Sequence, residues 1–179
     1  LLRSWLDFEP RQRAPFTVLA REEALTDVRV GPLRLPLRVA RLARLPFPGQ
    51  PEESQPDESQ PDEGQCFGEM LLDYKTGRAA PADWLGERPD APQLPLYAVV
   101  ANRADLAAIA FAGVRPGNGM DMLGYQAHDN ILPKAGKLNT PTLQAQIDQW
   151  RVVLTALAED FYSGHARVSP KRYPNTCQS

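Results

Sequence analysis

A mixed α/β sandwich is the fold class that the sequence predicts for this chain. Three observations predict it: apolar residues alternate from Leu33 to Val39, a strand-like run at residues 68–77 ends in charged side chains, and a helical apolar stripe runs from Leu143 to Phe161. The order of elements is strands, a strand that ends in a polar site, a helix, two strands and a final helix. We therefore expect one mixed sheet with helices packed against it.

The length and composition fit one domain over all 179 residues. The sequence has no run of about 18 uncharged apolar residues and no basic-then-apolar leader, so we expect a soluble, cytoplasmic protein. Cys66 and Cys177 are too few and too far apart for a disulfide framework, which also fits a reducing compartment. An apolar, helix-like start without methionine predicts a fragment of a longer protein.

The net charge of -2 is an average over two unlike parts. Residues 50–64 are three near-copies of one acidic pentapeptide, and without their six acids the chain has 20 basic and 16 acidic residues. Proline, glutamine, serine and acid without aliphatic residues predict a disordered insert between two strands. Residues 1–44 hold nine arginines against five acids, which suits a phosphate-bearing partner and equally a solvated sheet face.

The N-terminal part predicts the end of a helix followed by an antiparallel meander. Apolar residues at helical spacing in residues 1–9 predict the helix end. Residues 16–20 and 25–30 predict strands with a break between them. The alternation that begins at Leu33 continues through Leu42, and Pro36 within it predicts a sheet edge or a bulge.

The strand at residues 68–77 carries the candidate site. Asp73 and Lys75 are two residues apart, so their side chains point to the same face, whereas Tyr74 points to the other. A carboxylate and an ammonium at the end of a buried strand can hold a divalent cation and position a nucleophilic water. The same spacing also suits a simple ion pair on an edge strand.

The helix expected at residues 93–102 brings two more polar side chains to this strand. Gln93 and Tyr97 lie one turn apart, and Pro95 is tolerated because it falls in the first turn. We expect the helix to lie beside the polar end of the strand, so that four polar side chains converge.

The remainder of the chain predicts two strands and a long helix. The strands are expected at residues 107–114 and 123–127. Thr140 is expected to cap the helix, Pro141 to begin it and Gly164 to end it. The buried stripe of this helix is expected to consist of Leu143, Ile147, Trp150, Leu154, Leu157 and Phe161.

The run from Asp73 to Gly77, followed by the run from Pro92 to Ala98, resembles the RecB-type branch of the PD-(D/E)XK nuclease superfamily. The likeness extends to the C-terminal nuclease domain of AddB-like bacterial proteins described as probable DNA repair proteins. It covers nearly the whole chain from Trp5 onward, apart from the acidic insert. Trp84 and Phe111 support it in the same order along the chain.

The resemblance implies a restriction-endonuclease-like mixed β-sheet flanked by helices, and Mg²⁺-dependent hydrolysis of phosphodiester bonds in DNA. In such a site Asp73 would be a metal-binding carboxylate and Lys75 the catalytic lysine. Gln93 and Tyr97 would contact DNA or support the site, and Glu22 resembles an upstream acidic metal position for which Glu23 competes. The implied partners are DNA and a helicase subunit or domain of a repair complex.

One departure changes the expected activity. The family carries a metal-binding aspartate in a run similar to residues 38–44, and here Ala40 and Ala43 replace both aspartates of that run. Because alanine offers no lone pair to Mg²⁺, we expect catalysis to be impaired, leaving DNA binding or a scaffold role in a helicase-nuclease complex. The alternative is an active exonuclease in which Glu22 or Glu69 substitutes for the missing carboxylate.

Two further features of the family, a terminal iron-sulfur cluster and a helix histidine, are not matched by the residues of this sequence. Relatives often bind an iron-sulfur cluster through cysteines at the end of the domain, but such a cluster needs four ligands and Cys177 alone cannot hold it. Cys66, beside the insert, is a poor partner for it. His128 and His165 do not stand at the position of the family's helix histidine, and we expect both on the surface.

Overall fold

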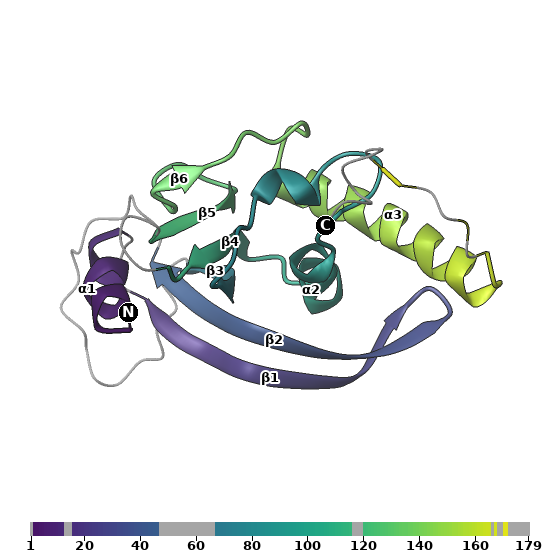
Figure 1. Cartoon of the computed structure of the whole chain (residues 1–179), viewed down its shortest axis with the longest axis horizontal. Helices are drawn as coiled ribbons and strands as arrows, with labels where there is room; N and C mark the ends of the chain where they lie inside the picture. The colour runs from purple at the N-terminus through teal and green to yellow at the C-terminus, as the bar shows by residue number, and fades with distance from the viewer. Residues whose placement is uncertain are drawn as a thin grey trace, which may run out of the picture.

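The computed structural model of the chain describes residues 2–12, 16–46, 67–115, 120–165, 167, 170 and 171. The strands form one six-stranded mixed sheet in the order β1-β2-β3-β4-β5-β6, and helices flank it (Figure 1). This α/β arrangement confirms the predicted fold class. In chain order the elements are α1 (Leu2–Gln12), β1 (Thr17–Val30), β2 (Leu33–Pro46), β3 (Phe67–Lys75), the 3₁₀ helix η1 (Pro81–Trp84), α2 (Gln93–Ala101), β4 (Leu106–Gly113), β5 (Asp121–Gln126), β6 (Lys134–Ala135) and α3 (Leu143–Tyr162).

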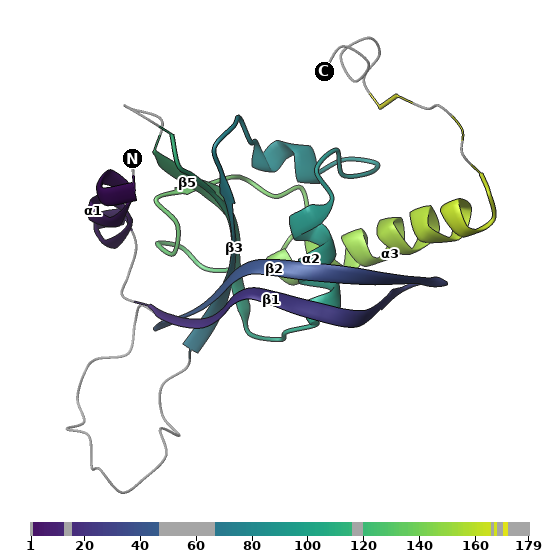
Figure 2. The same ribbon diagram turned by 60° about the horizontal axis from the view of Figure 1, so that its bottom comes forward.

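The sheet separates two hydrophobic clusters, because successive strand residues point to opposite faces. One cluster joins the sheet to α2 and α3 and includes Leu71 and Trp84. The other lies on the face that carries α1 and includes Trp5 and Leu72. Figure 2 shows α1 on one side of the sheet, with α2 and α3 on the other. A residue of β3 therefore belongs to one helical layer or the other according to its parity.

Strands β1 and β2 form a long curved hairpin. The structure corrects the break that we expected near residues 21–24, because β1 continues from Thr17 to Val30 with local irregularities instead. One irregularity lies between Leu25 and Val28, opposite Pro36, which confirms the predicted bulge. A side chain at Gly31 would lie 3.4 Å from Thr155 Cγ2, so the turn of the hairpin packs closely on α3.

The connection from β3 through α2 to β4 positions the polar end of β3. Strands β3 and β4 are parallel neighbours, which requires a crossover, and α2 provides it. All eight residues of β4 are buried, as expected for a central strand. Asn102, in the left-handed region with φ 44°, ends α2. The start of α2 is thereby held beside the end of β3.

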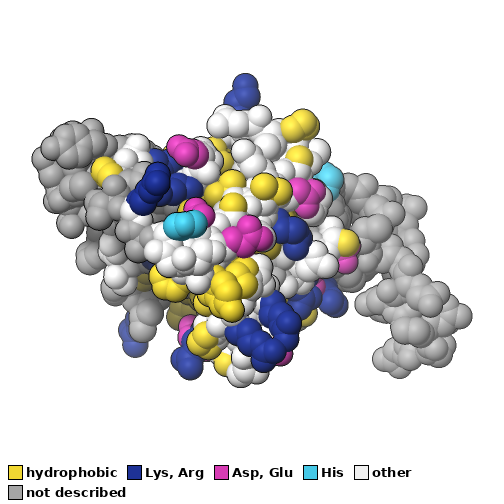
Figure 3. All heavy atoms as spheres, turned by 90° about the vertical axis from the view of Figure 1, so that its right-hand side faces the viewer, with side chains coloured by type: hydrophobic (Ala, Val, Ile, Leu, Met, Phe, Trp, Pro, Cys, Tyr) yellow, Lys and Arg dark blue, Asp and Glu magenta, His cyan; other side chains and the backbone are white. Residues whose placement is uncertain are grey.

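Helix α3 differs from the prediction at both ends. Thr142 is the N-cap rather than Thr140, and its side-chain oxygen accepts a hydrogen bond from the Ala145 backbone N–H at 3.0 Å. Phe161 does not belong to the buried stripe, because it is 74 % exposed where the helix runs past the sheet. Figure 3 views that end of the molecule, where hydrophobic and charged side chains mix. Gly164 follows the helix with φ 77°, as predicted.

Some predictions lie outside the described residues, namely the insert at 50–64, Cys66 and Cys177. The two-residue strand β6 was not predicted, since it is too short to show alternation. None of the helices in the described part of the chain is long and apolar enough to cross a membrane.

Candidate functional site

The candidate site lies where β3 meets the first turn of α2. Asp73 is only 5 % exposed, and Lys75 is half-buried at the end of the strand. The Lys75 carbonyl accepts a hydrogen bond of 2.8 Å from the Val114 backbone N–H, so β4 continues to hold β3 at this point. Both side chains point toward α2, on the same face as Leu71.

Four polar side chains form a continuous chain of contacts at this place. Lys75 Nζ lies 2.7 Å from Asp73 Oδ2, in an ion pair without the angles of an aligned hydrogen bond. Lys75 Nζ also donates to Gln93 Oε1 at 3.2 Å, and Gln93 Nε2 donates to the Tyr97 hydroxyl oxygen at 3.0 Å. The structure thus brings together the four residues that the sequence singled out. The charges of Asp73 and Lys75 balance, and the network opens to solvent at Gln93.

Ala40, on the neighbouring strand β2, comes directly before Arg41, the first residue of β2 that pairs with β3. Strands β2 and β3 are antiparallel, with Arg41 opposite Leu72 and Leu42 opposite Leu71. Continued by one residue, the same register places Ala40 opposite Asp73, at the Cα separation of about 4.5 to 5.5 Å that antiparallel partners have. A carboxylate at this position would neighbour the Asp73 carboxylate, but alanine presents only a methyl group.

Ala43, the second family position that carries alanine here, has different surroundings. It lies opposite Met70, which belongs to the cluster under α1, and both residues are fully buried. An aspartate at position 43 would therefore enter an apolar interior rather than the polar site.

The two acidic residues considered as substitutes are engaged elsewhere. Glu69 lies at the opposite end of β3, where Arg103 Nη1 donates to its two carboxylate oxygens at 2.9 and 3.0 Å. Glu22 lies on β1 opposite Ala40, because the pairs of Arg21 with Arg41 and of Glu23 with Val39 bracket it. Its side chain is 66 % exposed and forms an ion pair with Arg38 at 3.8 Å.

These residues do not fit a magnesium ion. Mg²⁺ requires near-octahedral oxygen ligands, and protein sites supply one or two carboxylates for it. Here the buried carboxylate of Asp73 already contacts an ammonium group, and neither Glu22 nor Glu69 is directed toward it. In the described ranges no group of three or more His, Cys, Asp or Glu side chains could hold a metal.

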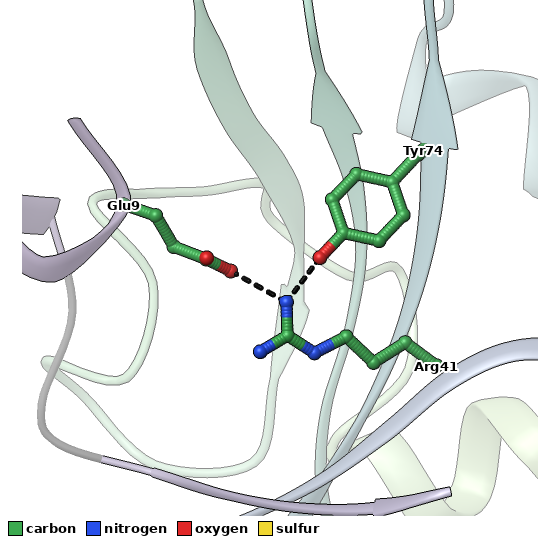
Figure 4. Close-up of polar contacts among 3 residues, drawn as sticks. All are labelled: Glu9, Arg41 and Tyr74. Atoms are coloured by element: carbon green, nitrogen blue, oxygen red, sulfur yellow. Dashed lines mark hydrogen bonds and ion pairs between the residues drawn. The ribbon is translucent and has the colours of Figure 1, made fainter. Parts of the chain in front are cut away.

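A second polar cluster lies on the opposite face of β3 and was missed by sequence reasoning. Arg41 Nη1 donates to Glu9 Oε1 at 3.0 Å and to the Tyr74 hydroxyl oxygen (Figure 4). The Arg41 guanidinium also lies 4.6 Å from the centre of the Phe16 ring. Trp5 meets the Tyr74 ring edge-on at 5.9 Å between centroids. This cluster joins α1 to the strand that carries Asp73.

The signal for this cluster was weak in the sequence. Arg41 stands in a strand between Ala40 and Leu42, where a charged side chain on the covered face needs a partner. That partner, Glu9, is 32 residues away in another element, and nothing local identifies it.

The loop that leads into α2 is anchored at two points, which fixes the place of Gln93. Trp150 Nε1 donates to the Trp84 carbonyl at 2.8 Å. Lys171 Nζ donates to the Leu85 carbonyl at 2.9 Å and pairs with Asp90 at 3.2 Å. Sequence reasoning also missed Lys171, whose partners are distant in the sequence.

Burial raises the pKa of Tyr125 above its ordinary value of 10.0, and the charge of Asp83 raises it further. His128 and His165 are both exposed, as predicted, and His165 Nδ1 lies 3.5 Å from Asp160.

Comparison with known proteins bears on the same segment. A sequence model of the PD-(D/E)XK nuclease superfamily matches residues 63–179. The matched region runs from just before β3 past the end of α3 and contains all four residues of the network. Among curated proteins, no match was found.

Proposed function

The chain belongs to the PD-(D/E)XK nuclease superfamily, and from this premise we propose that it is a nuclease-like domain that binds DNA with impaired or no cleavage. One observation carries the proposal. The last pair of β2 with β3 is Arg41 with Leu72, so the next position of the same register brings Ala40 opposite Asp73, and the buried Asp73 carboxylate is neutralised by Lys75 at 2.7 Å. A single carboxylate in an ion pair is a poor ligand for the metal that cleavage in this superfamily would need.

The expected loss of activity is large. Removing even groups that only orient a metal ligand costs about 10- to 100-fold in affinity or activity. Loss of a carboxylate that binds the metal directly should cost more. The polar network of Lys75, Gln93 and Tyr97 persists, so the place where a DNA strand would lie keeps its polar character.

We further propose a role in DNA repair, as a DNA-binding or scaffold module of a helicase-nuclease complex of the RecB type. The support is the resemblance of residues 73–77 and 92–98 to that branch, including AddB-like proteins. Such a complex would supply the helicase partner and the cleavage that this site lacks.

A nuclease assay on labelled linear DNA, with and without Mg²⁺, tests the proposal. We expect the natural chain to bind the DNA without measurable degradation. Ala40→Asp should create Mg²⁺-dependent degradation, which Lys75→Ala in the same background should abolish. Ala40→Asn is the matched control, because it has nearly the same shape as aspartate without the charge. If the natural chain degrades DNA in the presence of Mg²⁺ and Lys75→Ala abolishes this activity, the proposal that cleavage is impaired is refuted.

A second candidate function, an active Mg²⁺-dependent DNA exonuclease, is favoured by one observation. Glu22 lies opposite Ala40 on β1, so it is the carboxylate nearest in register to the missing one. Its weak, exposed ion pair with Arg38 would cost little to break. If the natural chain degrades DNA, Glu22→Gln should abolish the activity, whereas Glu23→Gln should leave it unchanged.

A further inference from the structure

The outer face of the β1-β2 hairpin carries a row of arginines that the candidate site does not use. Pairs such as Leu25 with Leu37 and Val28 with Leu35 point inward, toward α2 and α3. Arg34 and Arg38 alternate with these inward leucines of β2, and Arg29 lies directly opposite Arg34, so all three point outward. Arg21 lies directly opposite Arg41, whose side chain contacts α1 on the face away from α2 and α3. We call the four exposed arginines of this side, Arg21, Arg29, Arg34 and Arg38, the outer arginine face.

The register of the hairpin places like charges directly opposite each other. Arg29 pairs with Arg34 near the turn, and Arg21 pairs with Arg41 at the other end. Directly opposed like charges destabilise an antiparallel pair. Arg41 is compensated by Glu9 at 3.0 Å, but the Arg29 and Arg34 pair stands in solvent. A hairpin selected for stability alone would not need this arrangement, and a bound anion would relieve it.

The acidic residues of the hairpin compensate the arginines only in part. Arg34 lies 3.7 Å from Asp27, and Arg38 lies 3.8 Å from Glu22, with all four side chains 66 to 68 % exposed. Ion pairs as exposed as these are worth about 0 to 1 kcal/mol, so a phosphate can compete for the arginines. Within the described ranges, Arg21 and Arg29 have no ion-pair partner.

The shape and composition of the face favour a nucleic acid over a protein partner. Arg21 and Arg29 lie eight residues apart on β1, a distance of about 26 Å at 3.3 Å per residue, which matches about eight base pairs of duplex. The outward residues between the arginines include Ala24 and Pro36, which are too small to form the apolar centre of a protein interface. Figure 3 shows basic side chains along the lower margin of the molecule, where the hairpin lies in Figure 1.

We propose that the outer arginine face binds the phosphate backbone of duplex DNA. The inference rests on the proposed DNA-binding function and deepens it, because it places the DNA contact on the hairpin rather than at Asp73 and Lys75. The hairpin also lies outside residues 63–179, the part that matches the nuclease superfamily. Arg21 and Arg29 would bind phosphates directly, and Arg34 and Arg38 would exchange their exposed carboxylate partners for phosphates.

The test compares two double variants of the full chain in their affinity for a 30-base-pair duplex at several salt concentrations. Arg21→Gln/Arg29→Gln removes two positive charges from the outer arginine face. Lys134→Gln/Lys137→Gln is the matched control, because it removes two exposed positive charges around β6, at the opposite edge of the sheet. Thermal unfolding of both variants checks that they fold.

We expect the arginine variant to bind about tenfold or more weakly at 100 mM salt, and the slope of log K against log salt to fall by about 1.8, or 0.9 for each lost phosphate contact. The lysine variant should bind as the natural chain does. Equal affinities of the two variants, with DNA binding by the natural chain intact, would overturn the hairpin site and leave the proposed function standing. A natural chain that does not bind DNA would overturn both. Poly-glutamate that displaces the duplex at matched charge would identify an acidic-protein surface instead.

Discussion

The ion pair between Glu9 and Arg41 is the polar contact whose loss should most affect stability. Replacing Glu9 with alanine leaves the Arg41 guanidinium beneath α1 with its charge unbalanced. The side chains of Arg41 and Glu9 are 12 % and 6 % exposed, and their closest atoms are 3.0 Å apart. Breaking a buried pair from one side costs about 3 to 5 kcal/mol, because the remaining charge stays out of water.

The same chain contains a matched exposed pair. Glu22 and Arg38 are also a glutamate and an arginine, but they are 3.8 Å apart and about two-thirds exposed. Glu22→Ala should therefore change the free energy of unfolding by less than about 1 kcal/mol. For a chain of this size, the loss predicted for Glu9→Ala corresponds to a fall in Tm of about 6 to 20 °C.

Urea unfolding followed by tryptophan fluorescence measures both variants, since Trp5, Trp84 and Trp150 are all buried. A third variant, Glu9→Leu/Arg41→Leu, removes both charges and should recover most of the stability lost in Glu9→Ala. If Glu9→Ala costs no more than Glu22→Ala, the cluster in Figure 4 does not hold α1 to the sheet. In that case the burial argument is wrong.

Three more predictions test other parts of the structure. Gly124→Ala should prevent correct folding, because the new Cβ would collide with the Ile109 carbonyl oxygen. Gly77→Ala meets nothing within 4 Å and should be tolerated. Soluble yield and Tm of the two variants test this difference. Ala43→Asp should destabilise the fold by several kcal/mol, because it buries an unpaired carboxylate beside Met70. Ala40→Asp should not destabilise the fold to this extent, because position 40 is half-buried. Urea unfolding measures the free energy of unfolding of both variants. The raised pKa of Tyr125 means that the folded state holds this proton more tightly than the unfolded state, so stability present below pH 10 should fall as pH rises through the raised pKa. Tyr125→Phe should abolish that fall in unfolding measurements from pH 9 to 11.5, and an unchanged pH profile in the variant would contradict the assignment.

Local patterns were sufficient to predict most of the sheet and the polar network. The i, i+2 spacing of Asp73 and Lys75 and the one-turn spacing of Gln93 and Tyr97 each fix a direction in space. Because the connection between β3 and α2, which contains η1, is anchored to α3 and to Lys171, those directions converge in the structure. Their functional roles stay predictions.

The errors fall where distant contacts override local patterns. The hairpin continues through residues 21–24 because β2 pairs with it there, which no feature of β1 alone reveals. Phe161 fits the helical stripe but is exposed, since the stripe is longer than the layer it packs against. The pair of Glu9 and Arg41 joins elements 32 residues apart. Sequence periodicity describes one element at a time, so it cannot predict such pairings.

Adjacent residues of β2 serve opposite faces of the sheet, and this makes the Ala40→Asp experiment interpretable. Arg41 anchors α1 on one face, and the β2-β3 register extended by one residue beyond Arg41 and Leu72 brings Ala40 opposite Asp73. The fold is held by the two apolar clusters and the buried Arg41 pair, so position 40 can change without disturbing them. A new aspartate would be half-buried, and the Lys75 ammonium would offset its repulsion by Asp73. Failure of that variant to bind Mg²⁺ would therefore indicate a wrong register rather than a damaged fold.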